Sequence, residues 1–494
     1  MKNKLSLFKI DTSKIPKEAK EVLKALKEKG FFAYLVGGCV RDLLLNKTPK
    51  DWDVTTSARP EEIQKIFKKT VYDNKYGTVK VIFDGLVIEV TPFRKEIGYS
   101  DKRHPDKVEF GVSLKEDLAR RDFTINAIAL DLEIKKDLSI ANYQIIDYFE
   151  GIKDLSEKLI RAVGEASQRF LEDALRLIRA IRFSCQLNFE IEKNTFLAIK
   201  KNASLIKEIA KERIRDELEK IILSKAPKKG FFLLHQAGLL KYLIPELEKG
   251  LGVTQRGHHR WDVFWHLLNT LQAAADRNYS LEVRLAALLH DIAKPVCRRE
   301  EKDEVVFYGH QVVGAKMARK ILKRLRFKNE IIEKVCLLIK HHMFVYEIGK
   351  VTESGVRRLL RRVGKENIGD LLNLRIADRI GSGCKKAVPY RLRHLMYMLE
   401  KVSLDPISVK MLQVNGYDVM EILKIPPSRK VGLILDALLC LVLDDPSLNK
   451  KEILKEKIKE LGKLSEKELL EYRKRLDYRK KLKDLELKSK YYVK

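Results

Sequence analysis

The sequence predicts an α+β protein of several domains, in which a mixed sheet with its helices is followed by domains built from helices alone. Over residues 1–150, short apolar runs of strand length alternate with amphipathic segments. Beyond residue 150, apolar residues recur three and four positions apart, which is the spacing of one helix face. The length of 494 residues is too great for one ordinary core, so we expect at least three domains.

The charge of the chain points to a polyanionic partner. Lys and Arg number 99 against 69 Asp and Glu, which gives a formal net charge of +30. Nucleic acid is the leading candidate for a chain of this size, although a lysine-rich genome makes many proteins basic.

The cysteines and the apolar runs point to the cytoplasm. Six cysteines are scattered without a Cys-x-x-Cys pair, which argues against a disulfide framework or a zinc ribbon and fits a reducing cytosol. No apolar run reaches membrane-spanning length, and the N-terminus lacks the apolar core of a signal peptide. We therefore expect a cytoplasmic protein with no membrane partner.

The first chemical signal is a glycine pair that follows the first predicted strand, 31–36. Gly37 and Gly38 end this strand, and a short helix is expected over 40–45. A strand, a glycine turn and a helix start present backbone N–H groups to phosphate oxygens. Arg41 adds a fixed positive charge, so we interpret the turn as a phosphate-binding site.

Two carboxylates follow ten residues later. Asp51 and Asp53 are two positions apart, so on a strand they project to the same side. Two carboxylates held this close repel unless a cation lies between them, and Mg²⁺ prefers oxygen ligands and phosphates. Glu89 is an acid inside a later apolar strand, where burial without a partner would be costly. We expect the remaining head elements to be helices over 16–29 and 59–68 and strands over 77–83 and 86–91.

The pattern Gly-Gly-x-x-Arg-Asp followed by Asp-x-Asp resembles the nucleotidyltransferase superfamily that includes DNA polymerase beta. More closely, it resembles the tRNA nucleotidyltransferases (CCA-adding enzymes) and their poly(A) polymerase relatives. The resemblance implies a polymerase-beta-like catalytic head over 1–150, with Mg²⁺ on Asp51 and Asp53 and with Glu89 as the third carboxylate. It also implies that Gly37, Gly38 and Arg41 bind the nucleotide.

Two further head segments fit that family. The polar stretch 93–110 is expected to be an irregular, mobile loop, and it matches the family's flexible loop, which helps to switch specificity from C to A, at Arg94, Glu96, Tyr99, Asp101, Arg103 and Pro105. Residues 117–129 place a basic pair before an apolar run that reads as helical. By resemblance, Arg121 contacts nucleotide phosphates, Asp122 contacts the ribose 2′-OH, and Asn126 supports the site.

A neck and body are expected over 151–252, with one key helix over 168–183. Its charged side chains share one face at spacings of three and four, which alone is typical of a solvated, salt-bridged helix. The face matches the family's Glu-Asp-x-x-Arg motif, with Ala174 where proline is usual. The resemblance implies a protein template that reads the incoming base and its phosphates through Glu172, Asp173, Arg176, Arg179 and Arg182. Helices are also expected over 211–223 and 230–243, with His235 as a core histidine.

A second constellation lies over 253–385, where most of the ten histidines fall on apolar helical segments. The order His, His-Asp, Asp resembles the HD phosphohydrolase superfamily. That resemblance implies a metal site on His266, His290, Asp291 and Asp378, with His310, His341 and His342 as ligands of a second metal or a phosphate. The metal would be Mn, Ni, Co, Fe or Mg, and it would activate water to attack a phosphate. Attached HD domains differ in whether they keep this activity.

The last region, 386–494, is predicted to be a helical, basic tail. Residues 414–445 resemble the family's tail segment, and 449–494 carry a Lys/Glu helix pattern that is either a solvated face or a tRNA contact.

The whole sequence therefore predicts a tRNA nucleotidyltransferase that adds CCA from CTP and ATP, with tRNA as its partner. An enzyme that adds only A, a poly(A) polymerase, and a protein whose main activity is HD phosphodiesterase or phosphatase chemistry remain alternatives. The oligomeric state, monomer or dimer, stays open.

Overall fold

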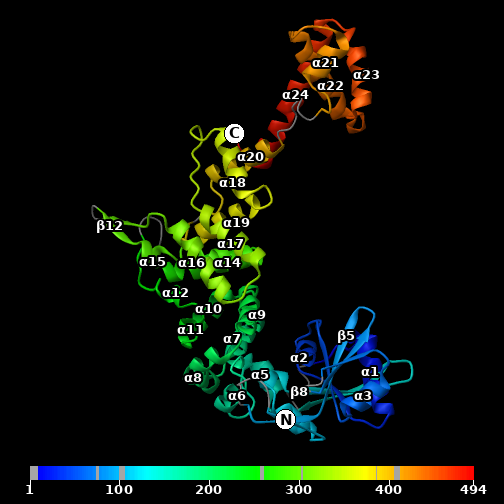
Figure 1. Cartoon of the computed structure of the whole chain (residues 1–494). Coiled ribbons are helices and arrows are strands. Elements are labelled where there is room, and N and C mark those ends of the chain that lie inside the picture. The colour runs from blue at the N-terminus through cyan, green and yellow to red at the C-terminus, as the bar shows by residue number, and fades with distance from the viewer. Residues whose placement is uncertain are drawn as a thin grey trace. The chain divides into compact units, whose positions relative to one another are not determined.

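The computed structural model describes residues 9–73, 77–99, 106–255, 261–301, 304–384, 386–404 and 412–493 (Figure 1). The chain divides into two compact units, 1–340 with 380–383 and 341–379 with 384–494. The four domains predicted from the sequence are a finer division and stay a prediction. Among the described residues, no helix combines the length and the apolar character that a membrane crossing requires.

The head of the first unit is a seven-stranded sheet. Its strand order is β3 (Thr70–Asp73), β4 (Thr78–Phe83), β5 (Leu86–Pro92), β2 (Trp52–Thr56), β1 (Ala33–Val36), β8 (Ile128–Ile134) and β9 (Ile140–Asp147). β2 and β5 run parallel, and every other neighbouring pair is antiparallel. The sheet is therefore mixed, as predicted. In this order β2 lies between β5 and β1, the strand that leads into the glycine turn.

Three short helices accompany the sheet. α1 (Lys17–Glu28) and α3 (Pro60–Ile66) pack against the sheet and against each other, and α2 (Gly38–Leu44) packs against β1, β2 and β8 (Figure 1). The apolar side of α1 is fully buried through Ala19, Val22, Leu23 and Leu26. The predicted strand–glycine–helix order at 31–45 is confirmed.

Two head segments differ from their predicted structure. The stretch 93–110 is not wholly irregular, because β6 (Arg94–Ile97) and β7 (Lys107–Phe110) pair as an antiparallel hairpin. Asp101, Arg103 and Pro105 lie outside the described residues. The apolar run before residue 130 is not a helix: after α4 (Leu114–Ala119) and one 3₁₀ turn (Thr124–Asn126) it becomes β8, between β1 and β9. The first three residues of β8, Ile128, Ala129 and Leu130, are all buried, so this stretch lacks strand alternation and resembles part of a buried helix.

The rest of the first unit is almost entirely helical. Its helices are α5 (Gly151–Glu157), α6 (Ala166–Glu172), α7 (Arg176–Leu187), α8 (Lys193–Asn202), α9 (Lys211–Ile222), α10 (Pro227–Gln236), α11 (Leu240–Leu243), α12 (Pro245–Glu248), α13 (Val263–Asp276), α14 (Leu281–Leu289), α15 (Lys294–Cys297), α16 (His310–Arg324) and α17 (Asn329–His341). Two small pairs of strands, β10 (Leu159–Ile160) with β11 (Glu190–Ile191) and β12 (Arg299–Glu301) with β13 (Glu304–Val306), complete it.

The key helix predicted over 168–183 is divided in two. Asp173 has an extended backbone, with φ −137° and ψ 103°, and it ends α6. Its carboxylate accepts a hydrogen bond from the Leu175 backbone N–H at 3.0 Å, just before α7 begins. Asp and Asn side chains compete in this way with the helix's own hydrogen bonds. The helix predicted over 230–243 is likewise divided, because Gly238 takes φ +68° between α10 and α11.

The second unit contains α18 (Glu353–Val363), most of α19 (Ile368–Gly381), α20 (Tyr390–Leu404), α21 (Gly416–Leu423), α22 (Arg429–Asp444), α23 (Lys451–Gly462) and α24 (Glu466–Lys490). The apolar side chains of α22 are the centre of a core that α21, α23 and α24 complete. Ser465 and Glu468 form a capping box that starts α24, as the Ser-x-x-Glu spacing allows. The tail is therefore a small helical module with its own core.

A buried ion pair joins α7 to α9. Arg182 is 8% exposed, and its Nε donates to Glu217 Oε2 at 2.9 Å. The Glu217 side chain is 4% exposed and also lies 3.0 Å from Lys220 Nζ. Burial acts to raise the pKa of Glu217, but the guanidinium groups of Arg182 and Arg179 outweigh it and hold that pKa below its ordinary value.

We predict that Glu217→Gln destabilises the first unit by about 3 kcal/mol, because it leaves Arg182 buried without a countercharge. Since the folded pKa of Glu217 is lowered, its stabilisation is present above the unfolded pKa of about 4.3 and is lost as the pH falls below it. Thermal unfolding at pH 7 and pH 3.5 measures both effects. The control is Glu219→Gln on the same helix, whose side chain is 29% exposed and 3.9 Å from Arg215. Equal losses for the two variants at pH 7 would contradict the argument.

Candidate active site and metal centre

The glycine turn between β1 and α2 lets two functional side chains approach the backbone closely. Gly37 has φ +81°, in the region that favours glycine. A Cβ at this position would lie 3.0 Å from a terminal nitrogen of Arg121 and 3.3 Å from Oδ2 of Asp53. Glycine therefore permits an arginine and a carboxylate to meet at the turn, which is the arrangement that a metal-bound phosphate requires.

Three carboxylates lie near one another where β2 begins beside the middle of β5. Asp53 lies directly opposite Glu89 in the parallel register, and Asp51 immediately precedes β2. Burial, followed by the carboxylates of Glu89 and Asp51, raises the pKa of Asp53 to about 6, and Arg121 opposes the rise. Asp53 is therefore a half-buried acid in a negative field, as the sequence predicted for a cation site.

Glu89 is placed differently from the buried position expected of it. Along β5, Ile88 and Val90 are buried, while Val87 and Glu89 are on the exposed face. The Glu89 carboxylate is 3.5 Å from Lys80 Nζ, and its side chain is 48% exposed. Strand alternation puts Glu89 on the face it shares with Asp53, so its predicted role as the third carboxylate stays open to test.

The donor set fits a divalent cation. Two carboxylates, Glu89 and Asp51, neighbour Asp53, and their negative charge adds to the effect of burial in raising its pKa; a cation would relieve this repulsion. Oxygen ligands of this kind suit Mg²⁺. Asp51 and Asp53, with Glu89 beside them, are the residues that would hold it.

A buried network lies behind the carboxylates. Asp122 accepts from Arg179 at 2.9 and 2.6 Å and from Asn126 Nδ2 at 3.0 Å. Asn126 in turn accepts from Arg41 at 2.8 Å, and Arg41 also binds Asp42 at 2.7 Å. Although burial opposes it, the pKa of Asp122 is held well below its ordinary value, first by Arg179 and then by Asn126. The network joins predicted residues of α2, the 3₁₀ turn and α7.

Two members of this region were not predicted from the sequence. Asp117 is fully buried; it accepts from Thr55 Oγ1 at 3.0 Å and pairs with Arg120 at 2.8 Å. The ring of Phe183 lies under three guanidinium groups, those of Arg41 at 5.1 Å, Arg179 at 5.4 Å and Arg182 at 3.5 Å. Asp117 belongs to a charged run that resembles a solvated face, and Phe183 resembles any core aromatic, so neither gave a functional signal.

The predicted base-reading residues are engaged with protein partners. Asp173 binds Arg213 at 2.9 Å, and Arg176 binds Glu172 at 2.7 Å and the Arg120 carbonyl at 2.9 Å. Arg213, at the start of α9, was not predicted. Arg179 and Arg182, both predicted to hold phosphates, are paired with the carboxylates of Asp122 and Glu217, and their predicted role stays a prediction. Arg182 is buried against Glu217 and Phe183.

The base of the β6–β7 hairpin is tied to the same arginines. Glu96 binds Arg94 at 2.7 Å and Arg120 at 3.0 Å, and Tyr99 donates its hydroxyl hydrogen to Glu96. Despite burial, the positive charges of Arg120 and Arg94 lower the pKa of Glu96, and Arg176 contributes. Glu96 of the predicted flexible loop and Arg176 of the predicted template thus both contact Arg120.

A second cluster lies among the helices of the first unit. His266 of α13, His290 and Asp291 at the end of α14, and His310 at the start of α16 are all at most 5% exposed. The two Nε2 atoms of His266 and His290 are 3.1 Å apart. Asp291 Oδ2 lies 3.3 Å from His266 and 3.2 Å from His290, and Asp291 Oδ1 lies 3.3 Å from His310. Four of the seven predicted HD residues are therefore brought together.

The geometry of the imidazoles fits a cation. Nδ1 of His290 lies 3.0 Å from the Ala287 carbonyl and Nδ1 of His310 lies 2.7 Å from the Phe307 carbonyl. A carbonyl oxygen only accepts, so these Nδ1 atoms donate, and each neutral ring then presents an acceptor Nε2. Acceptor nitrogens facing a carboxylate repel one another unless a positive charge lies among them. Imidazole and carboxylate ligands suit a divalent transition metal, oriented by just such Nδ1–H to carbonyl bonds.

Lys294 was not predicted for this cluster. Its Nζ lies 2.6 Å from Asp291 Oδ2 and 2.5 Å from the Gln255 side-chain oxygen. The signal was its position three residues after Asp291, on the same turn. His341, His342 and Asp378 belong to the second unit, and their predicted metal ligation stays a prediction.

Known proteins resemble most of the chain. Residues 33–161 match the family model of the poly A polymerase head domain, 188–251 that of the probable RNA and SrmB-binding site of polymerase A, and 263–381 that of the HD domain. The CCA-adding enzyme of Ligilactobacillus salivarius is 50% identical over 227 residues, 46% of this chain and 54% of that protein. That of Pediococcus pentosaceus is 52% identical over 214 residues, 43% of this chain and 52% of that protein. The matched part thus spans about half the length of these curated relatives.

Solved structures extend the likeness. The Bacillus stearothermophilus CCA-adding enzyme in complex with CTP is 30% identical; the alignment covers 90% of this chain and 96% of that one, with a TM-score of 0.58. The Thermotoga maritima CCA-adding enzyme complexed with tRNA is 22% identical, covers 92% of this chain and 99% of that one, and has a TM-score of 0.50, which shows a shared fold.

We predict that Asp53→Asn stabilises the metal-free protein at pH 8 by about 3 kcal/mol, because burial and acidic neighbours raise the pKa of Asp53 to about 6. A carboxyl whose folded pKa is raised costs stability above that pKa, and the cost disappears as the pH falls through 6 towards the ordinary value. Thermal unfolding in EDTA should show the variant above the native protein at pH 8 and level with it at pH 4. Added Mg²⁺ should stabilise only the native protein. Asp84→Asn, at a fully exposed position, is the control; a native protein more stable than Asp53→Asn at pH 8 in EDTA would refute the argument.

We also predict that His266→Ala loses the metal of the second cluster, since it removes one converging Nε2. Metal content after dialysis against Mn²⁺, Co²⁺ or Ni²⁺, measured by elemental analysis, should fall by about one equivalent. His235→Ala should keep it, because His235 lies outside the cluster and its Nδ1 binds Glu248 at 2.7 Å. Unchanged metal content in both variants would exclude this centre.

Proposed function

The chain belongs to the family of CCA-adding enzymes, and from that premise we propose that it completes the 3′ end of tRNA with C, C and A from CTP and ATP. The observation that carries the proposal is the meeting of Asp53 and Arg121 at the Gly37 turn, with Glu89 opposite Asp53 on β5. A carboxylate site for a cation beside an arginine and a glycine turn is a site for a nucleoside triphosphate. The Bacillus stearothermophilus relative, which was solved with CTP, supports the same ligand class.

The proposed reaction is a nucleotidyl transfer. The 3′-hydroxyl oxygen of tRNA attacks the α-phosphorus of CTP or ATP, a new phosphodiester bond forms, and the bond from that phosphorus to pyrophosphate breaks. The hydroxyl proton is released, and pyrophosphate keeps the bridging oxygen. Bound Mg²⁺ would supply a lower pKa for the hydroxyl and neutralise charge on the leaving group. Asp51 and Asp53 hold the cation, and Arg121 neutralises phosphate charge at the turn.

Base selection is proposed to work by exchange of partners. Asp173 accepts hydrogen bonds, and it now accepts them from Arg213 and Leu175. An exocyclic amino group of cytosine or adenine is a donor that takes the same place, whereas uracil and guanine present a carbonyl oxygen there. Arg176 donates to a ring nitrogen or carbonyl, and Glu172 fixes its position at 2.7 Å. CTP and ATP are therefore accepted, and UTP and GTP are refused.

Asp122 has a second proposed role. Its carboxylate accepts hydrogen bonds from Arg179 and Asn126. We propose that it also accepts one from a ribose 2′-OH, which would distinguish ribonucleotides from deoxyribonucleotides.

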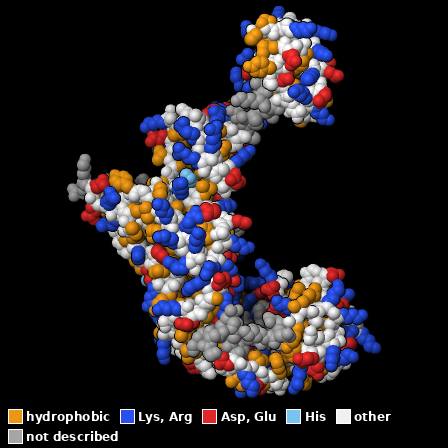
Figure 2. Space-filling view, viewed as in Figure 1, with side chains coloured by type: hydrophobic (Ala, Val, Ile, Leu, Met, Phe, Trp, Pro, Cys, Tyr) orange, Lys and Arg blue, Asp and Glu red, His pale blue; other side chains and the backbone are white. Residues whose placement is uncertain are grey.

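Binding of tRNA is proposed to rest on charge. Figure 2 shows Lys and Arg side chains spread widely over the visible face, with Asp and Glu between them. A net charge of +30 distributed in this way suits a long polyanion contacted at many phosphates. The cysteines, which are all free, agree with the reducing cytoplasm where we place the protein.

A second activity is proposed for the histidine cluster. The convergence of His266, His290, Asp291 and His310 fits metal-dependent hydrolysis of a phosphate ester. The histidine cluster and the carboxylate site share no residue, so substitutions can test the two proposed activities separately.

The purified protein should extend three tRNA substrates, ending before CCA, after the first C and after CC, to CCA and no further when CTP, ATP and Mg²⁺ are supplied. Gel analysis at single-nucleotide resolution measures this. Asp53→Asn should lower the rate by at least a hundredfold, because it removes a cation ligand. His290→Ala and Asp84→Asn should leave the rate unchanged.

Other outcomes would identify the alternatives. Extension of only the tRNA ending in CC, with ATP alone, indicates an A-adding enzyme, and long A tracts indicate a poly(A) polymerase. No extension of any substrate overturns the proposal and moves the histidine cluster to first place.

A further inference from the structure

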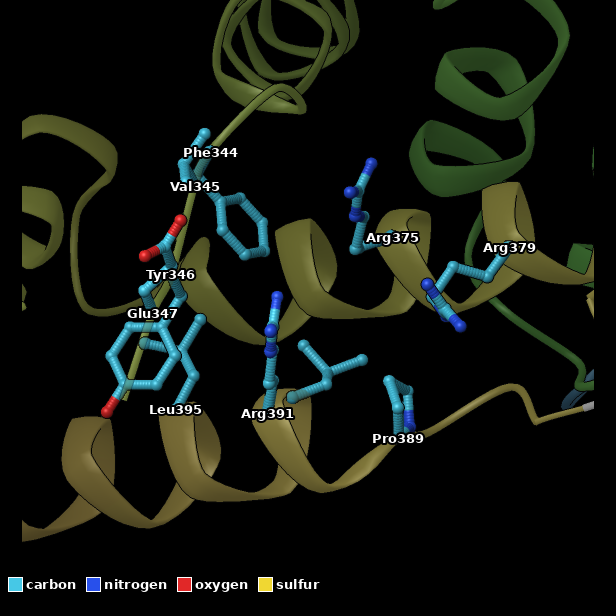
Figure 3. A pocket seen from close by; sticks show the side chains of 10 residues that line it. Phe344, Val345, Tyr346, Glu347, Arg375, Arg379, Pro389, Arg391 and Leu395 are labelled. Carbon is cyan, nitrogen blue, oxygen red and sulfur yellow. The ribbon is translucent and has the colours of Figure 1, made fainter. Parts of the chain in front are cut away.

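A cavity of about 230 Å³ lies in the second unit, between α19, α20 and the segment 344–347 (Figure 3). It shares no residue with the carboxylate site or with the predicted HD ligands. Its lining has two chemical parts: the aromatic side chains Phe344 and Tyr346, and the guanidinium groups Arg375, Arg379 and Arg391. In Figure 3, Arg391 extends from α20 towards α19 and Arg379 extends from α19 towards α20.

The positive charge of this cavity is not balanced by its own lining. Glu347 is the one acid among the lining residues, and it lies 2.6 Å from Lys350. Arg375 is 3.0 Å from Asp378. Within the part of the chain that the structure describes, neither Arg379 nor Arg391 forms an ion pair with an acid, and Arg379 Nε is buried without a hydrogen-bond acceptor. A buried donor without an acceptor is costly, and an anion in the cavity would satisfy it.

The neighbouring backbone adds to the same field. α20 begins at Tyr390, directly after Pro389 of the lining, so the positive end of a 15-residue helix lies at the cavity. Arginine forks suit phosphate oxygens in particular, because two parallel N–H groups match two oxygens.

The aromatic side gives the cavity a flat wall. Arg375 lies 5.9 Å from the Phe344 ring centroid, so the arginine and aromatic parts adjoin. The Tyr346 hydroxyl is fixed 2.6 Å from His394 Nδ1, which orients the ring. Flat rings stack on such walls, as nucleic-acid bases do on aromatic side chains. The volume is below the roughly 300–1,000 Å³ of large ligand pockets, which favours one small ligand.

We propose that this cavity binds a single nucleotide unit, with its phosphate on Arg379 and Arg391 and its base against Phe344 and Tyr346. The unit is either a free nucleoside monophosphate or the terminal nucleotide of an RNA, which share the same chemistry. The inference does not rest on the function proposed for the head.

Photo-crosslinking of 8-azido-AMP to the full chain in EDTA tests the site directly. The crosslinked peptides, identified by mass spectrometry, should contain residues 344–347 or 389–395. Because the head also binds nucleotides, the fraction of label in these peptides is the readout. Label confined to peptides of the first unit would overturn the proposal.

Calorimetric titrations with AMP and with inorganic phosphate test the aromatic part and the arginine part of the cavity. They are made in EDTA, on variants that also carry Asp53→Asn. Arg391→Ala should weaken binding of both probes about tenfold, which is the loss expected for one charged hydrogen bond. Arg361→Ala, an exposed arginine of α18 in the same unit, should change neither. Equal effects of the two arginine variants would refute a phosphate role for the cavity.

Phe344→Leu keeps apolar bulk but removes the flat ring. It should weaken AMP binding at least fivefold and leave phosphate binding unchanged, because stacking requires a ring. Loss of both to the same degree, with a lowered unfolding temperature, would instead mean that Phe344 only supports the fold. If an RNA with a terminal phosphate competes more strongly than AMP, the site is supported and its ligand is an RNA end. If AMP competes more strongly, the ligand is a free nucleotide.

Discussion

The contact between Asp122 and Arg179 is the interaction on which the arrangement of the first unit depends. Asp122 follows the short helix α4 of the head, and Arg179 is in the middle of α7. The pair therefore joins the sheet that carries the carboxylates to the helix that follows the template residues. Through Asn126 and Arg41 the same carboxylate also reaches the glycine turn. Separating the two groups would leave the buried Asp122 carboxylate without its strongest partner, which is costly, so the contact holds this part of the head on α7.

At the carboxylate site, unlike at the Asp122–Arg179 pair, charges of the same sign lie close together. Burial, and after it the acidic neighbours Glu89 and Asp51, raise the pKa of Asp53, so the fold holds this carboxyl in a state that water would not favour. A bound cation would offset both the burial of this carboxylate and its repulsion by the neighbouring acids, so the site gains more from a cation than a solvated carboxylate would. The stability that the carboxylate site gives up is small beside the apolar core beneath it, where Trp52 and Val54 are buried.

The sequence was informative where chemistry depends on neighbouring residues and weak where it depends on long-range packing. The glycine turn, the Asp pair and the histidine-aspartate dipeptide are local patterns, and each was predicted at its own position. The break at Asp173 was missed because helical spacing continues across it, and only the side chain's bond to Leu175 ends the helix. The start of β8 was read as helical because Ile128, Ala129 and Leu130 are all buried and show no alternation. Arg213, Lys294 and Asp117 were missed because their partners are set by the fold and not by spacing in sequence.

The β6–β7 hairpin has a consequence for how this chemistry can diverge. Its two strands are held at their base by Glu96 and Arg120, and its register is fixed by four paired positions from Arg94–Phe110 to Ile97–Lys107. Insertions and deletions between Ile97 and Lys107 therefore alter the reach of the loop without moving a strand of the main sheet. Changes in the length of this one connection can accumulate while the carboxylate site stays intact. The length of the loop that joins β6 to β7 can thus vary without a change in the main sheet.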